Sequence, residues 1–116
     1  MNRELLMLVD AISREKNVER DVVFGAVELA LASATKKVYA DGVDIRVVVD
    51  RDNGTYETFR RWLVVADEAG LQNPEAEELV TDARDEIADI EEGDYIEKPV
   101  ESLPIGRIGA QAAKQV

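Results

Sequence analysis

The chain has 116 residues, of which 46% are hydrophobic and 34% are charged, and it contains neither cysteine nor histidine. This length and composition are typical of one globular domain with a single core. The absence of cysteine excludes a disulfide framework and a thiolate zinc site, and the absence of histidine removes the commonest general base and metal ligand, so we do not expect an enzyme.

The net charge of −11 is unevenly distributed along the chain. Residues 75–94 carry −9, residues 1–74 carry −3 and residues 95–116 carry +1. Because nucleic-acid affinity comes mainly from neutralising phosphates, we expect no uniform binding to DNA or RNA, although a local basic patch is compatible with this pattern. No apolar run approaches the roughly 20 residues of a membrane helix, and the N-terminus lacks a signal-peptide pattern, so we expect a cytoplasmic protein without membrane contact.

Two helices are predicted at the N-terminus. Asn2 can cap the first, which ends in "REKN" and has an apolar stripe of Leu5, Leu6, Val9 and Ile12. The second runs from about Glu19 to Ala40, with Gly42 at its end. Lys36 and Lys37 fall in its last turns, where a positive charge complements the helix dipole. Its apolar face consists of Val23, Val27, Ala30, Leu31, Ala34 and Val38.

A β-hairpin follows, because the hydrophobic period changes from 3.6 to 2. The strands "VDIRVVVD" and "TYETFRRWLVV" flank "RDNG", and Asn-Gly favours a hairpin turn. The apolar end of the second strand predicts cover on both faces. An EF-hand calcium loop needs glycine at its sixth position and glutamate at its twelfth. Counted from Asp50, Gly54 is fifth and Arg61 is twelfth, which favours the plain hairpin.

The remaining elements are shorter. Residues 76–82 fit a short strand or a helix start equally well. Residues 82–92 fit an acidic helix, and residues 93–100 fit a closing strand whose end Pro99 places at a sheet edge. A last helix is predicted from Pro104 onward, with no residue that would stop it. Its apolar face holds Ile105, Ile108, Ala112 and Val116, and Arg107 and Lys114 share the opposite face.

Two motifs leave alternatives open. The acidic run from Glu75 to Asp94 is predicted to be a solvated face, with a docking surface for a basic partner as the second interpretation and a divalent-metal site, hence an acidic metal-dependent enzyme, as the third. The two helices around Asn17 also allow a helix-turn-helix-like DNA-binding module. The first half of the second helix, "ERDVVFGAVELALA", argues against that module because it is apolar and net negative. No cofactor or metal is expected.

Five stretches, read together, resemble the N-terminal domain of the bacterial transcription factor NusA family. They are "MNRELLMLVDAISREKNV", "ALASATKKVY", "DIRVVVDRDNGTYETFRRWLVV", "EEGDYIEKPVES" and "GRIGAQAAKQV". They lie in the order of the family and span essentially the whole chain. The combination of "TFRRWLVV" with "AAKQV" is far more specific than a short motif.

The resemblance implies an α+β fold, in which a small mainly antiparallel sheet, made of the hairpin and a closing strand, packs against an N-terminal helix pair. Residues 1–104 would form the polymerase-binding domain, and residues 105–116 would begin a C-terminal linker helix that leads to absent OB-fold and KH domains. The domain would dock, as a monomer, on RNA polymerase at the β-subunit flap tip near the RNA exit channel, with the α subunit as a second contact. It would modulate pausing, intrinsic termination and antitermination, without catalysis.

The same resemblance implies a site. Side chains at the positions of Lys37, Arg107 and Lys114 would lie toward the nascent RNA hairpin, and we include the neighbouring Lys36 in this RNA-facing basic patch. Contacts of this kind reach the RNA backbone and stabilise it without reading its sequence.

Overall fold

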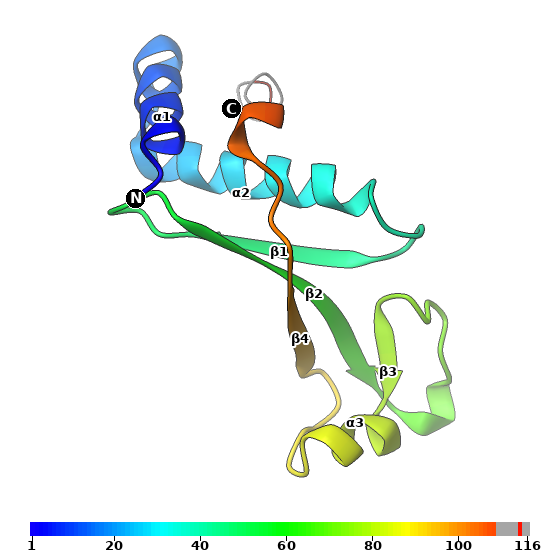
Figure 1. Ribbon diagram of the computed structural model, residues 1–116. Coiled ribbons are helices and arrows are strands. Elements are labelled where there is room, and N and C mark those ends of the chain that lie inside the picture. The colour runs from blue at the N-terminus through cyan, green and yellow to red at the C-terminus, as the bar shows by residue number, and fades with distance from the viewer. Residues whose placement is uncertain (109–113, 115–116) are drawn as a thin grey trace.

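The computed structural model describes residues 1–108 and residue 114, and it arranges them in two lobes joined by the paired strands β2 (Tyr56–Val65) and β4 (Tyr95–Val100), as Figure 1 shows. Its principal dimensions are 50 × 25 × 23 Å. The helices are α1 (Arg3–Lys16), α2 (Arg20–Lys36) and α3 (Val80–Glu86), with short 3-10 turns η1 (Asp67–Ala69) and η2 (Ile105–Arg107). The strands are β1 (Asp44–Val49), β2 (Tyr56–Val65), β3 (Glu77–Leu79) and β4 (Tyr95–Val100). The predicted α+β class, with the helix pair against a mainly antiparallel sheet, is confirmed.

Helix α1 begins and ends where the sequence predicts. The Asn2 side chain accepts a hydrogen bond from the Leu5 N–H at 3.0 Å, which satisfies a free donor of the first turn. Asn17, in the left-handed region at φ 54°, ends the helix. Leu5, Val9 and Ile12 are buried, so the predicted stripe faces the core.

Helix α2 ends at Lys36, four residues before the predicted end. The N–H groups of Val38 and Tyr39 donate to the carbonyls of Thr35 and Lys36, so the chain leaves the helix in tight turns. The prediction that Val38 belongs to the apolar face is therefore wrong, because these turns leave its side chain 67% exposed. Lys36 and Lys37 do lie at the helix end, as predicted.

Strand β2 is the centre of the sheet. Its first part pairs with β1 on one edge and with β4 on the other, both antiparallel, and Thr58 to Arg61 are paired on both sides. Beyond Arg61, β3 replaces β1 on the first edge and runs parallel to Leu63–Val65. The undecided residues 76–82 thus contain both a strand and a helix start. The predicted acidic helix over residues 82–92 begins earlier, at Val80, and ends at Glu86.

The hairpin connection differs from the predicted Asn-Gly turn. It spans residues 50–55, closed by a hydrogen bond from the Asp50 N–H to the Thr55 carbonyl at 2.8 Å. Only Gly54, at φ 75°, has the positive φ that a two-residue turn of the predicted kind needs at both positions. A Cβ on Gly54 would lie 2.6 Å from the Asn2 carbonyl oxygen, so glycine lets the loop contact the start of α1.

Two separate clusters of buried side chains form the core. The main cluster joins α1, α2, β1 and η2, and it includes Phe24, Leu31, Ile105 and Ile108. The small cluster lies under α3 and consists of Val64, Ala83, Ile90 and Ile96, with Trp62 and Val80 packed against it. We call these units the main lobe and the α3 lobe. On the other face of the β2 end, Leu63 and Val65 are half-buried, so the predicted cover on both faces is only partial.

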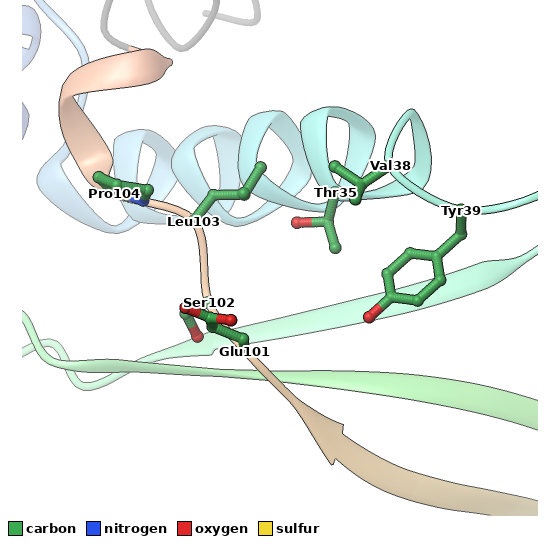
Figure 2. Close-up of a pocket in the computed structure, with 7 residues that line it drawn as sticks. All are labelled: Thr35, Val38, Tyr39, Glu101, Ser102, Leu103 and Pro104. Atoms are coloured by element: carbon green, nitrogen blue, oxygen red, sulfur yellow. The ribbon is translucent and has the colours of Figure 1, made fainter.

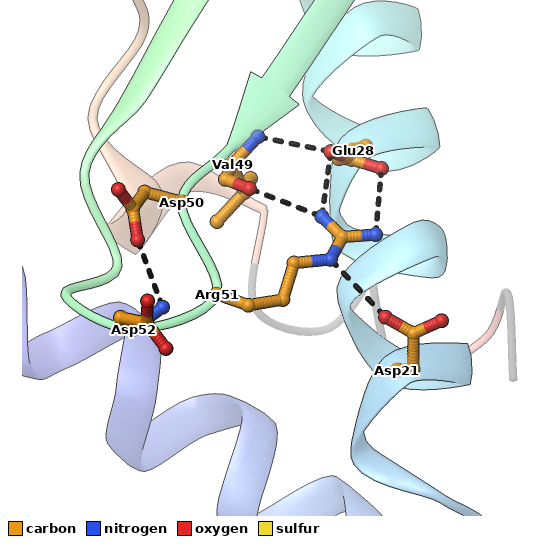
Figure 3. A network of polar contacts seen from close by, with 6 residues as sticks. All are labelled: Asp21, Glu28, Val49, Asp50, Arg51 and Asp52. Atoms are coloured by element: carbon orange, nitrogen blue, oxygen red, sulfur yellow. Dashed lines mark hydrogen bonds and ion pairs between the residues drawn. The ribbon is translucent and has the colours of Figure 1, made fainter.

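An arginine holds the hairpin to α2 (Figure 3). The Arg51 guanidinium contacts a carboxylate oxygen of Glu28 at 2.8 Å and one of Asp21 at 3.2 Å. The hydrogen bond to Glu28 raises the pKa of Arg51. The same Glu28 carboxylate accepts the Val49 N–H at 2.9 Å, so one acidic side chain fixes both the edge of β1 and the loop after it.

Candidate functional site

The structure places the predicted basic residues in two segments. Lys36 is the last residue of α2 and Lys37 is its C-cap, and both side chains are exposed. Arg107 ends η2, but its side chain lies outside the described part of the chain. Lys114 is exposed. The predicted C-terminal helix falls largely on residues 109–113 and 115–116, which lie outside the described residues, so the convergence of the four cations stays a prediction.

A surface groove of about 300 Å³ lies beside Lys36 and Lys37 (Figure 2). The end of α2 and the turn after it form one wall, and the segment between β4 and η2 forms the other. The groove is lined by Thr35, Val38, Tyr39, Glu101, Ser102, Leu103 and Pro104. We call it the α2 groove. Its walls combine apolar side chains, those of Val38, Leu103 and Pro104, with the hydroxyl groups of Thr35, Tyr39 and Ser102 and the Glu101 carboxylate.

The second wall is held in place by side chains of β2. The hydroxyls of Thr58 and Ser102 are hydrogen bonded at 2.8 Å, and the Tyr56 hydroxyl donates to the Leu103 carbonyl. Directly after the groove, Ile105 and Ile108 insert into the main cluster. The wall is therefore fixed at both ends, although its backbone belongs to no helix or strand.

Each wall continues directly into a predicted basic segment. Lys36 and Lys37 lie between Thr35 and Val38 of the first wall, and Arg107 follows three residues after Pro104 of the second. A groove with exposed apolar side chains can bind an apolar side chain of a partner, and exposed lysines that neighbour it in the sequence can approach phosphates or carboxylates. The sequence pattern did not predict this groove, because it depends on how the chain returns from β4 to α2.

Tyr56 is expected to make the stability of the fold depend on pH in a measurable way. Burial raises the pKa of Tyr56, and the negative charge of Glu4 raises it further. An acid whose pKa is raised by folding contributes stability that is fully present below its unfolded pKa and is lost as the pH rises through the folded pKa. The unfolded value of a tyrosine is about 10.

We therefore expect the stability advantage of the wild type over Tyr56→Phe to be about 1 kcal/mol at neutral pH, the size of one hydrogen bond. The advantage should be constant up to pH about 9 and decline above pH about 10, because Tyr56 ionises more easily in the unfolded chain than in the folded one, where it donates to Leu103. Urea unfolding of both proteins across this range measures the difference. The comparison cancels the contributions of all groups that the two proteins share. A difference that stays constant to pH about 11 would contradict this role of Tyr56.

The acidic segment forms much of the α3 lobe. Most of its carboxylates are exposed, as predicted for a solvated face. Two carboxyl groups have shifted pKa values, Glu78 within the segment and Asp67 before it. Burial and the neighbouring Glu86 raise the pKa of Glu78, whereas hydrogen bonds from Thr81 lower the pKa of Asp67. Among the described residues, no group of three or more acidic side chains is placed to hold a metal ion.

No helix in the described ranges has the length and apolarity needed to cross a membrane. Nor does the exposed part of α2 have the features of a DNA-reading helix. The exposed residues of α2 are Arg20, Asp21, Val22, Leu29, Ser33 and Lys36. The two cations lie at opposite ends of the helix with an anion and two apolar side chains between them, so this surface offers little to base edges.

Comparisons with known proteins agree on one family. The family model described as the NusA N-terminal domain matches residues 4–116. The transcription termination/antitermination protein NusA of Halalkalibacterium halodurans is 34% identical over 125 residues, covering 100% of this chain and 30% of the relative. The protein of the same name from Rickettsia conorii is 29% identical, covering 99% of this chain and 22% of the relative. The solution structure of the N-terminal domain of NusA from B. subtilis matches with a TM-score of 0.66 at 30% identity, covering 99% of this chain and 90% of that one.

Proposed function

Because the chain belongs to the NusA N-terminal domain family, we propose that it docks on RNA polymerase near the RNA exit channel, at the flap tip of the β subunit. The observation that carries this proposal is the family match over residues 4–116. The chain spans 30% or less of the length of the two curated relatives, which are named as transcription termination and antitermination proteins. Modulation of pausing, intrinsic termination and antitermination, with the α subunit as a second contact, is part of the proposal.

The α2 groove supports a docking role and suggests which surface is used. Val38 is 67% exposed on one wall, and Leu103 is half-buried on the other. Such side chains can receive an apolar anchor from a polymerase helix, since interface energy concentrates in a few apolar contacts inside a polar rim. The basic patch of Lys36, Lys37, Arg107 and Lys114 would then face the emerging RNA hairpin.

A binding measurement with purified bacterial core RNA polymerase tests both parts of the proposal. We expect saturable binding of the chain, and we expect Val38→Asp to weaken it at least about tenfold, since a charge would enter the apolar groove. Met7→Asp is the matched control, because Met7 is 71% exposed but lies on α1, away from the groove. The absence of saturable binding would contradict docking. Weakening by Met7→Asp alone would contradict the choice of the groove.

A further inference from the structure

The two lobes have separate cores, and the antiparallel pair of β2 and β4 runs between them. Buried side chains of the main cluster come from α1, α2, β1 and η2, whereas the small cluster draws on the end of β2, on α3 and its following loop, and on β4. A narrow, twisted strand pair can still bend and rotate between two packed units. Side-chain contacts that reach from one lobe to the other therefore contribute to the orientation of the α3 lobe.

Arg60 lies where the two lobes meet. Its guanidinium is 5.7 Å from the ring centre of Tyr39, which packs against the main cluster. On the other side it is 4.7 Å from the ring of Trp62, which packs against the small cluster. It also donates to Glu75, at 2.8 Å to the carboxylate and 3.2 Å to the carbonyl. One side chain thus contacts both cores and the segment before β3.

The burial of Arg60 distinguishes it from the arginine of an ordinary surface ion pair. Only 22% of its side chain is exposed, and its Nε is buried without an acceptor among the described residues. Leaving a buried donor unpaired is unfavourable, so the contacts with the two rings and Glu75 must outweigh that loss. The planar guanidinium suits this position, since it stacks on aromatic rings and donates in its own plane at the same time.

A second contact joins the same two segments at the sheet edge. The Asn73 side chain donates to the Gly42 carbonyl at 2.8 Å. Gly42 has φ 90°, and a Cβ there would lie 2.6 Å from the Asn73 side-chain oxygen, so the approach depends on glycine. Both contacts therefore link the connection between α2 and β1 with the connection between η1 and β3.

We propose that Arg60 holds the α3 lobe against the end of α2. The α3 lobe and the wall of the α2 groove that contains Tyr39 would then move as one body. Tyr39 belongs to the groove and to the Arg60 contact at once. Anything that displaces Tyr39 therefore loosens the α3 lobe, and a partner that holds the lobe fixes the wall of the groove. This coupling is a property of the chain itself and does not depend on which partner docks.

This coupling can be tested by measuring the distance between the lobes in solution. The chain contains no cysteine, so Ser33→Cys on α2 and Asp85→Cys on α3 introduce two unique, exposed sites for spin labels. Double electron–electron resonance then reports the distribution of distances between them. We expect one narrow distribution for the otherwise wild-type chain. In Arg60→Gln we expect a second population, in which the α3 lobe has rotated away from the end of α2. The ratio of molecules with the wild-type distance to molecules with other distances should fall by about tenfold, as expected for the loss of a charge-assisted hydrogen bond.

Arg51→Gln is the matched control. Arg51 also pairs with acids, Asp21 and Glu28, and its guanidinium lies 5.2 Å from a ring centre, that of Phe24. All three partners belong to α2 in the main lobe, so its replacement should leave the distribution of distances between the lobes narrow. Tyr39→Leu should broaden the distribution as Arg60→Gln does, because it removes the ring on the main-lobe side.

Circular dichroism verifies that each variant is folded, and Arg60→Lys serves as the substitute if Arg60→Gln does not fold. Lysine keeps the charge but not the stacked plane, so it should also broaden the distribution. A distribution as narrow in the folded Arg60 variant as in the wild type would overturn the proposal. Equal broadening in Arg51→Gln would overturn it as well, since the effect would then not be specific to the contact between lobes.

Discussion

Replacing Ile108 by alanine is expected to destabilise the domain by about 2–5 kcal/mol, the range for truncating a large buried aliphatic side chain. Ile108 is 0% exposed and packs in the main cluster beside residues of α1 and α2. Because a small domain has only about 5–15 kcal/mol of stability, this loss would be a large part of the total. Urea unfolding followed by circular dichroism measures it.

Ile87→Ala is the control for this measurement. Ile87 is 43% exposed in the α3 lobe, and its truncation should change the free energy of unfolding by no more than about 0.5 kcal/mol. If Ile108→Ala is as mild as Ile87→Ala, then Ile108 does not anchor the C-terminal segment to the main lobe. The anchor bears on the proposed docking role, because the segment just before Ile108 is the second wall of the α2 groove.

The anchoring of Ile105 and Ile108 is a part of the fold that the sequence predicts well. Their spacing places them on one face of a helical turn, and both are buried. The same reasoning predicted the Asn2 cap and the hairpin strands. In each of these cases the signal is local, because a period of 3.6 or 2 and a capping side chain depend only on neighbours in the chain.

The features that the sequence did not predict depend on contacts between distant segments. Helix propensity gave no reason for α2 to end at Lys36, since Val38 and Tyr39 suit a helix as well as a turn. The chain turns there, and the ring of Tyr39 lies 5.7 Å from the guanidinium of Arg60, which is 21 positions further along. Likewise, Arg60 and Arg61 look equivalent in the sequence. Only the packing shows that Arg60 lies between the rings of Tyr39 and Trp62, whereas Arg61 pairs with Asp44 of β1 and stacks on Tyr95 of β4.

The candidate site also has one part that the sequence predicts and one part that it does not. Lys36 and Lys37 at the end of α2 follow from helix periodicity, and the structure places them as expected. The groove beside them could not be predicted from helix periodicity, because its second wall comes from residues 101–104, far away in the sequence. The role of the basic patch itself rests on the family and is the subject of the last prediction.

Replacing Lys37, Arg107 and Lys114 together by glutamate is expected to leave polymerase binding nearly intact and to reduce pausing that depends on an RNA hairpin. Each solvent-exposed contact with a phosphate contributes at most about 1 kcal/mol, and the contribution falls with salt. Three such contacts would amount to at most about 3 kcal/mol, or roughly a hundredfold in the lifetime of the paused complex. Isolated RNA binding should be weak, because the contacts become effective only when docking raises the local concentration of RNA.

The matched control replaces three other basic residues by glutamate, so that the net charge changes by the same amount. Arg3, Arg14 and Lys16 are exposed on α1, so their replacement by glutamate gives the same net charge as the basic-patch variant. A general electrostatic effect of added negative charge would reduce pausing in both variants. A specific patch would reduce it only in the first, and the difference between the variants should shrink as the salt concentration rises, because counterions screen exposed charges. Wild-type pausing by the Lys37, Arg107 and Lys114 variant, with docking on polymerase verified, would refute contact between this patch and the RNA hairpin.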